Sequence, residues 1–483
     1  MVQIMMQQRT IWILLVGILF SFSSGAGELA DDLSQRLSKR ISSSAIKKEE
    51  LGILAFLHQE GQATRLIDLN GQNSMVPASL TKILTAGMSL EKYPPGHKFF
   101  TELLSVNKAS GTTLKGDLYL KGGGDPAFVS ESMWFLVNEF YRTGVRRIEG
   151  DVVVDDTRFD SERFHEGRDP SRVDRAYDAP VGAMSFNWNS INIYVRPGEK
   201  AGEKARIFAD PENSYITVVN KAVTGKKGSR KNLKAERKSN GSNGDTIVVH
   251  GSLALDADEA VIYKGILHPD TWSGSHLKAF LQRRGIVVTG GVRTGATPSK
   301  ANLLAQAESK PIGQIVTDMM KFSNNYVAEM LTKNLAVEQK GEPGTMANGL
   351  IALSDYLVEK GFKADKFSIT SPSGLSRENR LSPAQFHRIL EDLRKNFTVF
   401  SEFISSLPIS GIDGTLKSRM NQPPAKGWVR AKTGMLNGVA GLAGYAGRED
   451  GGIVTFVFLF NGRAGHTISA RDLFDQLATE LVQ

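Results

Sequence analysis

A serine and a lysine stand one helical turn apart at the start of an apolar helix, and this stretch constrains the chain more than any other. Ser79 precedes Lys82 by three residues. The apolar residues around them recur at the spacing of one helix face, at Leu80, Ile83, Leu84 and Met88. Both polar side chains then lie on one side of the first turn. A neutral amine there can accept the serine proton and make a nucleophile, and the N–H groups of the helix start favour negative charge.

The Ser-x-x-Lys pattern alone does not identify a catalytic residue. It occurs four more times, at Ser44–Lys47, Ser89–Lys92, Ser105–Lys108 and Ser275–Lys278. The plainer interpretation of each is a solvated lysine on a helix. The assignment of Ser79 therefore depends on motifs further along the chain.

The first residues predict export. Arg9 precedes an apolar run over residues 11–20, and small residues follow at Ser24 and Ala26. This pattern is typical of a secretory signal peptide over residues 1–26. The run is short for a membrane span, which makes a retained anchor the second interpretation. We expect the protein in the periplasm or elsewhere in the cell envelope outside the cytoplasm.

The composition excludes several kinds of site. The 483 residues include no cysteine, which excludes disulfides, thiolate metal sites and a cysteine nucleophile. The eight histidines are scattered and form no His-x-x-x-His pair, so a zinc hydrolase has no support. We expect neither a metal nor a cofactor.

Most of the net charge of +8 comes from one segment. Residues 221–238 hold eight Lys or Arg and one Glu, together with Gly, Ser and Asn. This composition predicts a mobile, solvated loop. A nucleic-acid site is not expected, because the segment offers no aromatic or groove-reading elements. Peripheral contact with the cell wall or a membrane surface is an open interpretation.

Chain length and the order of predicted elements indicate two or three domains. Strands over residues 51–57 and 63–69 precede the serine-bearing helix, and short strands then dominate over a long stretch. Helical patterns follow, and three strands at hairpin spacing and a last helix end the chain. We assign residues 27–95 and 275–483 to one domain and residues 96–274 to one or two inserted domains, mostly β.

Two more motifs lie in the C-terminal part of the chain. Ser323 and Asn325 form a Ser-x-Asn motif between two predicted helices, where a hydroxyl can relay a proton and an amide can orient a substrate. Lys432, Thr433 and Gly434 end a predicted strand. The lysine offers positive charge to a carboxylate, the threonine offers a hydroxyl, and the glycine leaves room for a substrate along the strand edge.

The three motifs in this order resemble the signature of penicillin-recognising serine enzymes. More narrowly, the chain resembles the penicillin-binding protein 4 type of D-alanyl-D-alanine carboxypeptidase and endopeptidase, in which large domains separate the first two motifs. Further family-like strings occur at residues 116–120, 153–156, 373–377 and 411–416.

The resemblance implies an α/β fold, a transpeptidase- or β-lactamase-like antiparallel sheet flanked by helices, with large, mostly β insertions. It also implies acyl transfer through an ester on Ser79, with Lys82 as base and Ser323 as proton relay to the leaving amine. Lys432 and Thr433 are expected to hold the terminal carboxylate of the substrate.

The same resemblance implies an oxyanion hole made by the backbone N–H groups of Ser79 and Met435. The implied ligands are peptidoglycan stem peptides and β-lactam antibiotics. Two alternatives stay open, a β-lactamase-like hydrolase with the same motifs and a non-catalytic penicillin-binding sensor.

Arg377 is a candidate for recognition of the substrate side chain. A wall peptide of the diaminopimelate type carries an ammonium and a carboxylate at that end, and an arginine can bind the carboxylate with two parallel hydrogen bonds. Asp174 or Asp178 of the inserted region could supply the matching acid. An ion pair between Arg377 and Glu378 is the plainer interpretation.

Overall fold

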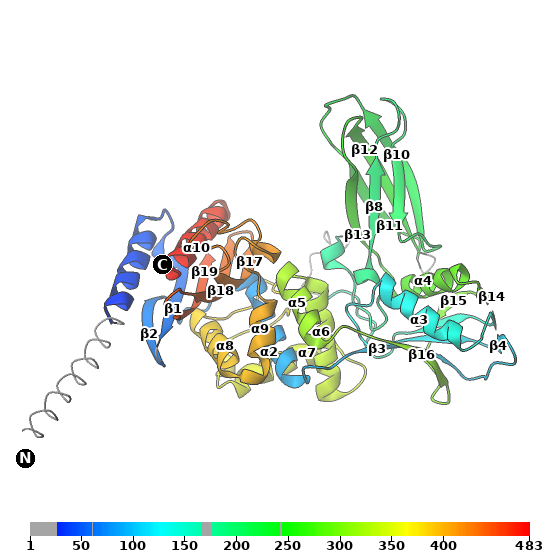
Figure 1. Ribbon diagram of the computed structural model, residues 1–483, viewed down its shortest axis with the longest axis horizontal. Coiled ribbons are helices and arrows are strands. Elements are labelled where there is room, and N and C mark those ends of the chain that lie inside the picture. The colour runs from blue at the N-terminus through cyan, green and yellow to red at the C-terminus, as the bar shows by residue number, and fades with distance from the viewer. Residues whose placement is uncertain (1–26, 60, 166–174, 242–243) are drawn as a thin grey trace, which may run out of the picture.

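The computed structural model describes residues 27–483 apart from residue 60 and the segments 166–174 and 242–243. The predicted signal peptide and Asp174 lie outside the described residues. In the described part of the chain, no helix is both long and apolar enough to cross a membrane. Figure 1 shows an elongated molecule with a main domain at one end, an inserted region at the other, and a narrow arm that projects from the inserted region.

The main domain is built on one antiparallel sheet that joins the two ends of the chain. Its strands, in spatial order, are β17 (Val429–Leu436), β18 (Val439–Gly447), β19 (Ile453–Asn461), β1 (Leu51–Gln59) and β2 (Gln62–Leu69). Strand β1 pairs with β19, so that Leu51 lies opposite Phe460. The predicted α/β fold with a central antiparallel sheet is confirmed.

Each face of the sheet packs against its own helical layer. Along β19, Phe456 and Phe458 face the core beneath α10 (Thr467–Leu481) and the helix over residues 27–43. Val457 and Leu459 face the opposite core. This alternation follows from the two-residue period of a strand and explains why β19 is apolar along most of its length.

The helices of the second layer gather around α2. Its helices are α2 (Lys82–Lys92), α5 (Ile312–Phe322), α6 (Asn325–Lys340), α7 (Met346–Glu359), α8 (Pro383–Lys395) and α9 (Phe397–Ser406). Residues 82–90 of α2 are all buried, because α5, α6 and α9 pack around them.

The inserted region has a five-stranded mixed sheet of its own. The strands, in spatial order, are β15 (Val292–Thr294), β7 (Val152–Asp155), β5 (Leu118–Gly122), β3 (Phe100–Ser105) and β16 (Asn302–Glu308). The other elements are α3 (Ser130–Arg142), α4 (Pro269–Arg283), β4 (Thr113–Lys115), β6 (Arg147–Glu149) and β14 (Val287–Val288).

The chain returns to the main domain later than the sequence suggests. Our interpretation places the return at residue 275, but Trp272 and Leu277 of α4 are fully buried in the core of the inserted region. Strand β16 pairs with β3, with Asn302 opposite Ser105. The return therefore lies near residue 310. A helical pattern shows that α4 has an apolar face, but it does not show which core covers that face.

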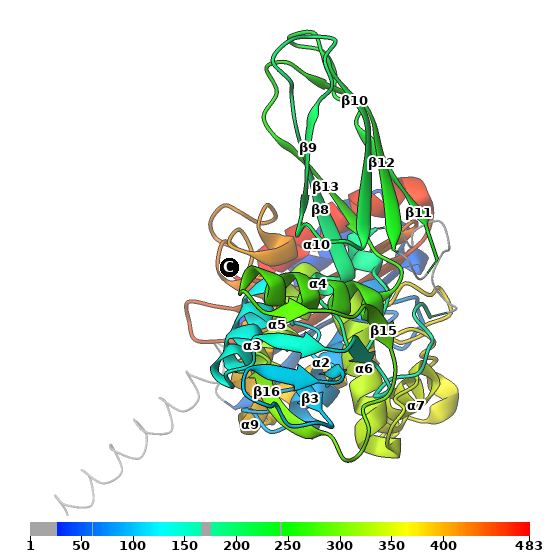
Figure 2. The ribbon, with the colours of Figure 1, turned by 90° about the vertical axis from the view of Figure 1, so that its right-hand side faces the viewer.

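The arm consists of two three-stranded sheets that extend away from the rest of the molecule (Figures 1 and 2). One contains β13 (Ala260–Gly265), β8 (Ser190–Arg196) and β9 (Arg206–Asp210), and the other contains β10 (Ile216–Gly225), β12 (Asp245–Ala254) and β11 (Lys234–Ser239).

The segment 221–238 is mostly strand, which differs from the predicted loop. Lys221 lies in β10, and β11 begins at Lys234 and pairs with β12. Ala222 and Ala235 face the interior, while most basic side chains face solvent. A strand that alternates between small apolar and basic residues has the composition of a loop, and this accounts for the difference.

The aromatic contacts of β19 give a stability prediction. Phe458 is fully buried, with ring centroids 4.7 Å from Phe456 and 5.7 Å from Phe474. Phe458→Ala is expected to lower the free energy of unfolding of the main domain by about 3–5 kcal/mol, since it leaves a cavity in a packed core. Urea unfolding measures this.

Phe397 at the start of α9 is the matched control, because its side chain is 95% exposed. Phe397→Ala should change the free energy of unfolding by less than about 0.5 kcal/mol. Equal unfolding midpoints for the two variants would contradict the assignment of Phe458 to this core.

Candidate active site

Ser79 lies in a 3₁₀ turn, Ala78–Thr81, that leads directly into α2. Two other segments approach the backbone of this turn closely. A Cβ atom at Gly374 would collide with the carbonyl of Ala78, and one at Gly434 would lie 3.4 Å from the nitrogen of Ser79. Glycine at both positions therefore lets a loop and a strand end close around the serine. The room that Gly434 leaves is taken by protein backbone.

The amine of Lys82 is the centre of a hydrogen-bonded group. It is fully buried, and its Nζ lies 3.1 Å from Ser79 Oγ. The same nitrogen donates to Asn325 Oδ1 at 2.7 Å and to the carbonyl oxygen of Ser373 at 2.5 Å. Ser79, Lys82 and Asn325, which come from two of the three motifs, therefore meet at one atom.

Burial lowers the pKa of Lys82 from 10.5 to about 7. An ammonium group without bulk water is destabilised relative to the neutral amine, and this effect exceeds the opposing attraction of Glu329 and Asp178. A lysine with this pKa is partly neutral at neutral pH. Lys82 can therefore accept a proton from the adjacent serine, as a general base must.

The second and third motifs meet in an adjoining group. Lys432 Nζ donates to Ser323 Oγ at 2.8 Å, which leaves the Ser323 hydroxyl hydrogen available to another acceptor. The hydroxyls of Thr433 and Thr415 lie 2.8 Å apart. Ser323 directly follows the last residue of α5 and adopts the left-handed conformation, with φ 54. This conformation turns the chain between α5 and α6 at the Ser-x-Asn motif.

Lys432 is also fully buried, and its pKa is lowered well below the usual value. Burial is the main cause, and repulsion by Lys82 adds to it. The charge of Lys82 therefore affects the pKa of Lys432, although the two residues belong to different motifs. An anionic substrate group bound beside Lys432 would favour its charged form.

Asn325 connects the lysine to the inserted region. Its Nδ2 donates to Asp178 Oδ1 at 3.0 Å, and Asp178, at the end of the 3₁₀ turn Ala176–Asp178, is 1% exposed. The position of Asp178 does not fit the acid of a substrate side-chain pocket, because its carboxylate is buried against the amide of Asn325. Asp174, the other candidate, lies outside the described residues.

Arg377 and Met435 lie at the exposed rim of the site. Met435 is 47% exposed, on the last residues of β17. Arg377 is exposed, and its Nη2 donates to the carbonyl oxygen of Asn437 in the turn that follows β17. The guanidinium therefore bridges the loop that contains Ser373 and the strand end that contains the third motif.

Sequence reasoning gave no role to three residues that the structure places at the site. Ser373 supplies a carbonyl to Lys82, Glu329 acts on it electrostatically, and Thr415 contacts Thr433. Ser373 and Thr415 occur within family-like strings, and this is the only feature of the sequence that points to them as site residues. Glu329 follows the Ser-x-Asn motif by one helical turn, a spacing that carries no chemical meaning by itself.

One group of described side chains has the spacing of metal ligands. Potential ligand atoms of His58, His387 and Glu391 lie within 4.8 Å of one another. Arg394 donates to both carboxylate oxygens of Glu391, at 3.2 and 2.8 Å. A guanidinium in that position opposes a second cation. The group, between β1 and α8, therefore acts as a charged network that ties the helix to the sheet.

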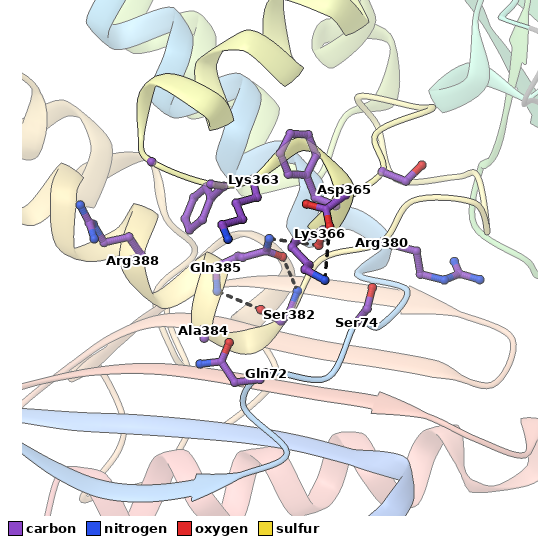
Figure 3. A pocket seen from close by; sticks show the side chains of 14 residues that line it. Gln72, Ser74, Lys363, Asp365, Lys366, Arg380, Ser382, Ala384, Gln385 and Arg388 are labelled. Carbon is purple, nitrogen blue, oxygen red and sulfur yellow. Dashed lines mark hydrogen bonds and ion pairs between the residues drawn. The ribbon is translucent and has the colours of Figure 1, made fainter.

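A cavity of about 590 Å³ lies next to the N-terminal end of α8 (Figure 3). It opens between the start of α8 and residues 361–368, and its lining contains no motif residue. The basic side chains around it are Lys363, Lys366, Arg380 and Arg388. The reaction site and this cavity are therefore separate features.

Comparisons with known proteins agree with this arrangement. The model of the D-Ala-D-Ala carboxypeptidase 3 (S13) family matches residues 33–481. A D-alanyl-D-alanine carboxypeptidase of Actinomadura sp. (strain R39) is 30% identical over 93% of this chain and 85% of its own length.

Solved structures agree as well. The crystal structure of penicillin binding protein 4 from Haemophilus influenzae has a TM-score of 0.77 at 25% identity, over 92% of this chain and 98% of that one. A second structure of that protein, complexed with a β-lactam, has a TM-score of 0.71 at 25% identity over the same shares, 92% and 98%. This chain therefore belongs to the D-Ala-D-Ala carboxypeptidase 3 (S13) family and is a serine-type D-Ala-D-Ala carboxypeptidase.

Proposed function

We propose that Ser79 forms the acyl-enzyme and that Lys82 is the base that activates it. The observation that carries this proposal is the buried Lys82 amine 3.1 Å from Ser79 Oγ. An exposed lysine would keep its proton at neutral pH, whereas a pKa of about 7 leaves a large neutral fraction. Ser79 attacks the carbonyl of the penultimate D-alanine while its proton passes to Lys82.

The negative charge that develops on the carbonyl oxygen needs hydrogen-bond donors. The backbone N–H groups of Ser79 and Met435 fill this role in our proposal, and the close approach of Gly434 to Ser79 supports it. Lys432 and Thr433 bind the terminal carboxylate of the peptide, since one offers a buried charge and the other a hydroxyl.

The leaving amine needs a proton as the C–N bond breaks. Because Ser323 Oγ accepts from Lys432, its own hydrogen can go to the amine, and Ser323 then regains a proton from protonated Lys82 directly or through Lys432. Water afterwards attacks the ester, which releases the shortened peptide and restores the Ser79 hydroxyl. Protons are conserved over the cycle.

Three further proposals concern ligands and location. A β-lactam presents a strained amide next to a carboxylate and so fits the same groups, as the β-lactam complex of the Haemophilus influenzae protein illustrates. Endopeptidase activity on cross-linked stem peptides follows from the same chemistry with a larger leaving group. Export to the periplasm, or elsewhere outside the cytoplasm, is supported by the pattern of residues 1–26.

The arm is proposed as a peripheral contact with the cell wall or a membrane surface. Lys226, Lys227, Arg230 and Lys231 lie on the segment between β10 and β11. Within the described residues these four side chains make no ion pair, so their charge is open to solvent. Such an attraction would weaken as salt is added.

Replacement of the nucleophile tests the proposal directly. Ser79→Ala should abolish covalent labelling by a penicillin and lower hydrolysis of a D-Ala-D-Ala peptide by roughly 10⁴-fold or more. Mass spectrometry of the labelled peptide identifies the site. Ser44→Ala is the control, because Ser44 precedes Lys47 at the same spacing and should be labelled normally. A label that maps to any other serine would exclude Ser79.

The pKa of Lys82 predicts a pH dependence. Only the neutral amine is a base, so the acylation rate should rise with pH up to about 7, by about tenfold per pH unit at most, and then level off. Stopped-flow acylation by a penicillin measures this rise. Lys82→Arg should be inactive at every pH, and residual activity in it would argue against a lysine base.

The rim position of Arg377 supports a role in side-chain recognition. Arg377→Ala should cost roughly 1–3 kcal/mol in kcat/KM for a peptide with a free zwitterionic side-chain end, by loss of a charged hydrogen-bond partner. Acylation by benzylpenicillin, which lacks that end, should change far less. Arg388→Ala, an exposed arginine on α8, is the matched control. Equal losses for both substrates would mean that Arg377 supports the fold.

A further inference from the structure

We infer that Asp178 of the inserted region is a positioning residue that sets the orientation of the Asn325 amide and so directs the lone pair of Lys82 toward Ser79. This inference rests on the proposed role of Lys82 as the base. It assigns the inserted region a part in catalysis through a contact inside the site, separate from any role in binding the cell wall.

Asp178 contacts the amide of Asn325 directly. The carboxylate is 1% exposed and accepts a hydrogen bond from Asn325 Nδ2 over 3.0 Å. An ionised carboxylate can only accept hydrogen bonds, whereas an amide has a donor end and an acceptor end. Asp178 therefore selects the NH₂ end of Asn325, and the carbonyl end must point the other way.

The orientation of the Asn325 amide determines which hydrogen bonds Lys82 can make. The carbonyl end of Asn325 faces the amine, and Oδ1 lies 2.7 Å from Nζ. The backbone oxygen of Ser373, 2.5 Å from Nζ, is also a pure acceptor. A neutral amine has two N–H bonds and one lone pair, and these two acceptors engage both N–H bonds.

The lone pair is then left for the remaining neighbour, Ser79 Oγ at 3.1 Å. This is the geometry that a base needs to remove the hydroxyl proton. If the Asn325 amide were reversed, its NH₂ group would donate to Lys82 and occupy the lone pair. Asp178 prevents that reversal, because a reversed amide would place two acceptors against each other.

The charge of Asp178 has a second effect on the same amine. The charged groups that face Lys82 are Asp178 from the inserted region, Glu329 from α6 and Lys432 from β17. The two carboxylates raise the pKa of Lys82 and partly offset the larger effect of burial. Removal of the charge at Asp178 should therefore lower that pKa and extend the neutral form to lower pH.

The position of Asp178 in the fold makes this contact a link between the two parts of the chain. The 3₁₀ turn Ala176–Asp178 packs against α6, whose first residue is Asn325. The turn is held from the other side by a bridge between Arg175 and Lys264, at the base of the arm. The catalytic amide is therefore anchored to the inserted region through one buried carboxylate.

Two substitutions separate the orientation effect from the charge effect. Asp178→Ala removes the acceptor, and Asp178→Asn keeps the shape but replaces a pure acceptor with an amide that can also donate. The rate of acylation by benzylpenicillin is measured by stopped flow across pH, together with the melting temperature. Asp178→Ala should lower the plateau rate by roughly 10- to 100-fold, as expected for a misdirected catalytic group.

The acid limb is the part of the pH profile in which the acylation rate rises with pH, and in both variants it should move to lower pH. The acylation rate should fall less in Asp178→Asn than in Asp178→Ala. Asp155→Asn is the control, since Asp155 is a buried carboxylate of the inserted region that binds Thr157 and the backbone of Thr297. It should leave both the plateau and the limb unchanged. The presence of an acid limb in the wild-type protein and the labelling of Ser79 test the proposed function itself, because neither requires the contact between Asp178 and Asn325.

Two results would overturn the inference. Wild-type rates and an unmoved limb in both Asp178 variants would show that the amide keeps its orientation without the carboxylate. A lower rate or melting temperature with the acid limb unmoved would show that Asp178 only stabilises the fold. Asp178→Asn is the decisive variant if Asp178→Ala does not fold, since it fills the same volume.

Discussion

The burial of the Lys82 amine is the interaction on which the rest of the site depends. Moving an ammonium group out of water is strongly unfavourable, so the group either loses its proton or is stabilised by partners. Here both occur, because its pKa falls to about 7 and three oxygen atoms lie within hydrogen-bond distance. The helices around α2 provide the burial, and the loop at Ser373 and the amide of Asn325 provide the partners.

This dependence explains why the site draws on segments so far apart in the chain. The pairing of β1 with β19 brings the N-terminal and C-terminal parts into one sheet, and the serine turn follows β2 while Lys432 lies in the middle of β17. Gly374 and Gly434 then allow two more backbones to approach Ser79. No local segment contains more than one motif, so the amine is buried only when the whole main domain is folded.

Part of this arrangement could be predicted from the sequence and part could not. Ser79 with Lys82, Ser323 with Asn325, and the Lys432 triplet were accessible because each is a local pattern on one element, and the apolar periods of α2 and β19 indicate which faces are buried. The return of the chain near residue 310 was missed, since α4 has an apolar face that could pack on either domain. The sequence of the basic strands β10 and β11 predicts a loop instead, because their inward residues are small. The contact between Asp178 and Asn325 joins residues that are distant in sequence, and no periodicity reports it.

The backbone next to the Ser79 hydroxyl and at Ser323 adopts an uncommon conformation. Ala78, immediately before the nucleophile, and Ser323 both have positive φ, 49 and 54. Residues other than glycine adopt this region at a cost of about 1–3 kcal/mol, and they keep it only where the surroundings determine it. At Ala78 the surroundings are the closely packed Gly374 loop, and at Ser323 they are the bond from buried Lys432 and the helix that begins at Asn325. The same tight packing that excludes water from Lys82 therefore also fixes the Ser79 and Ser323 hydroxyls, with which Lys82 exchanges protons in the proposed mechanism.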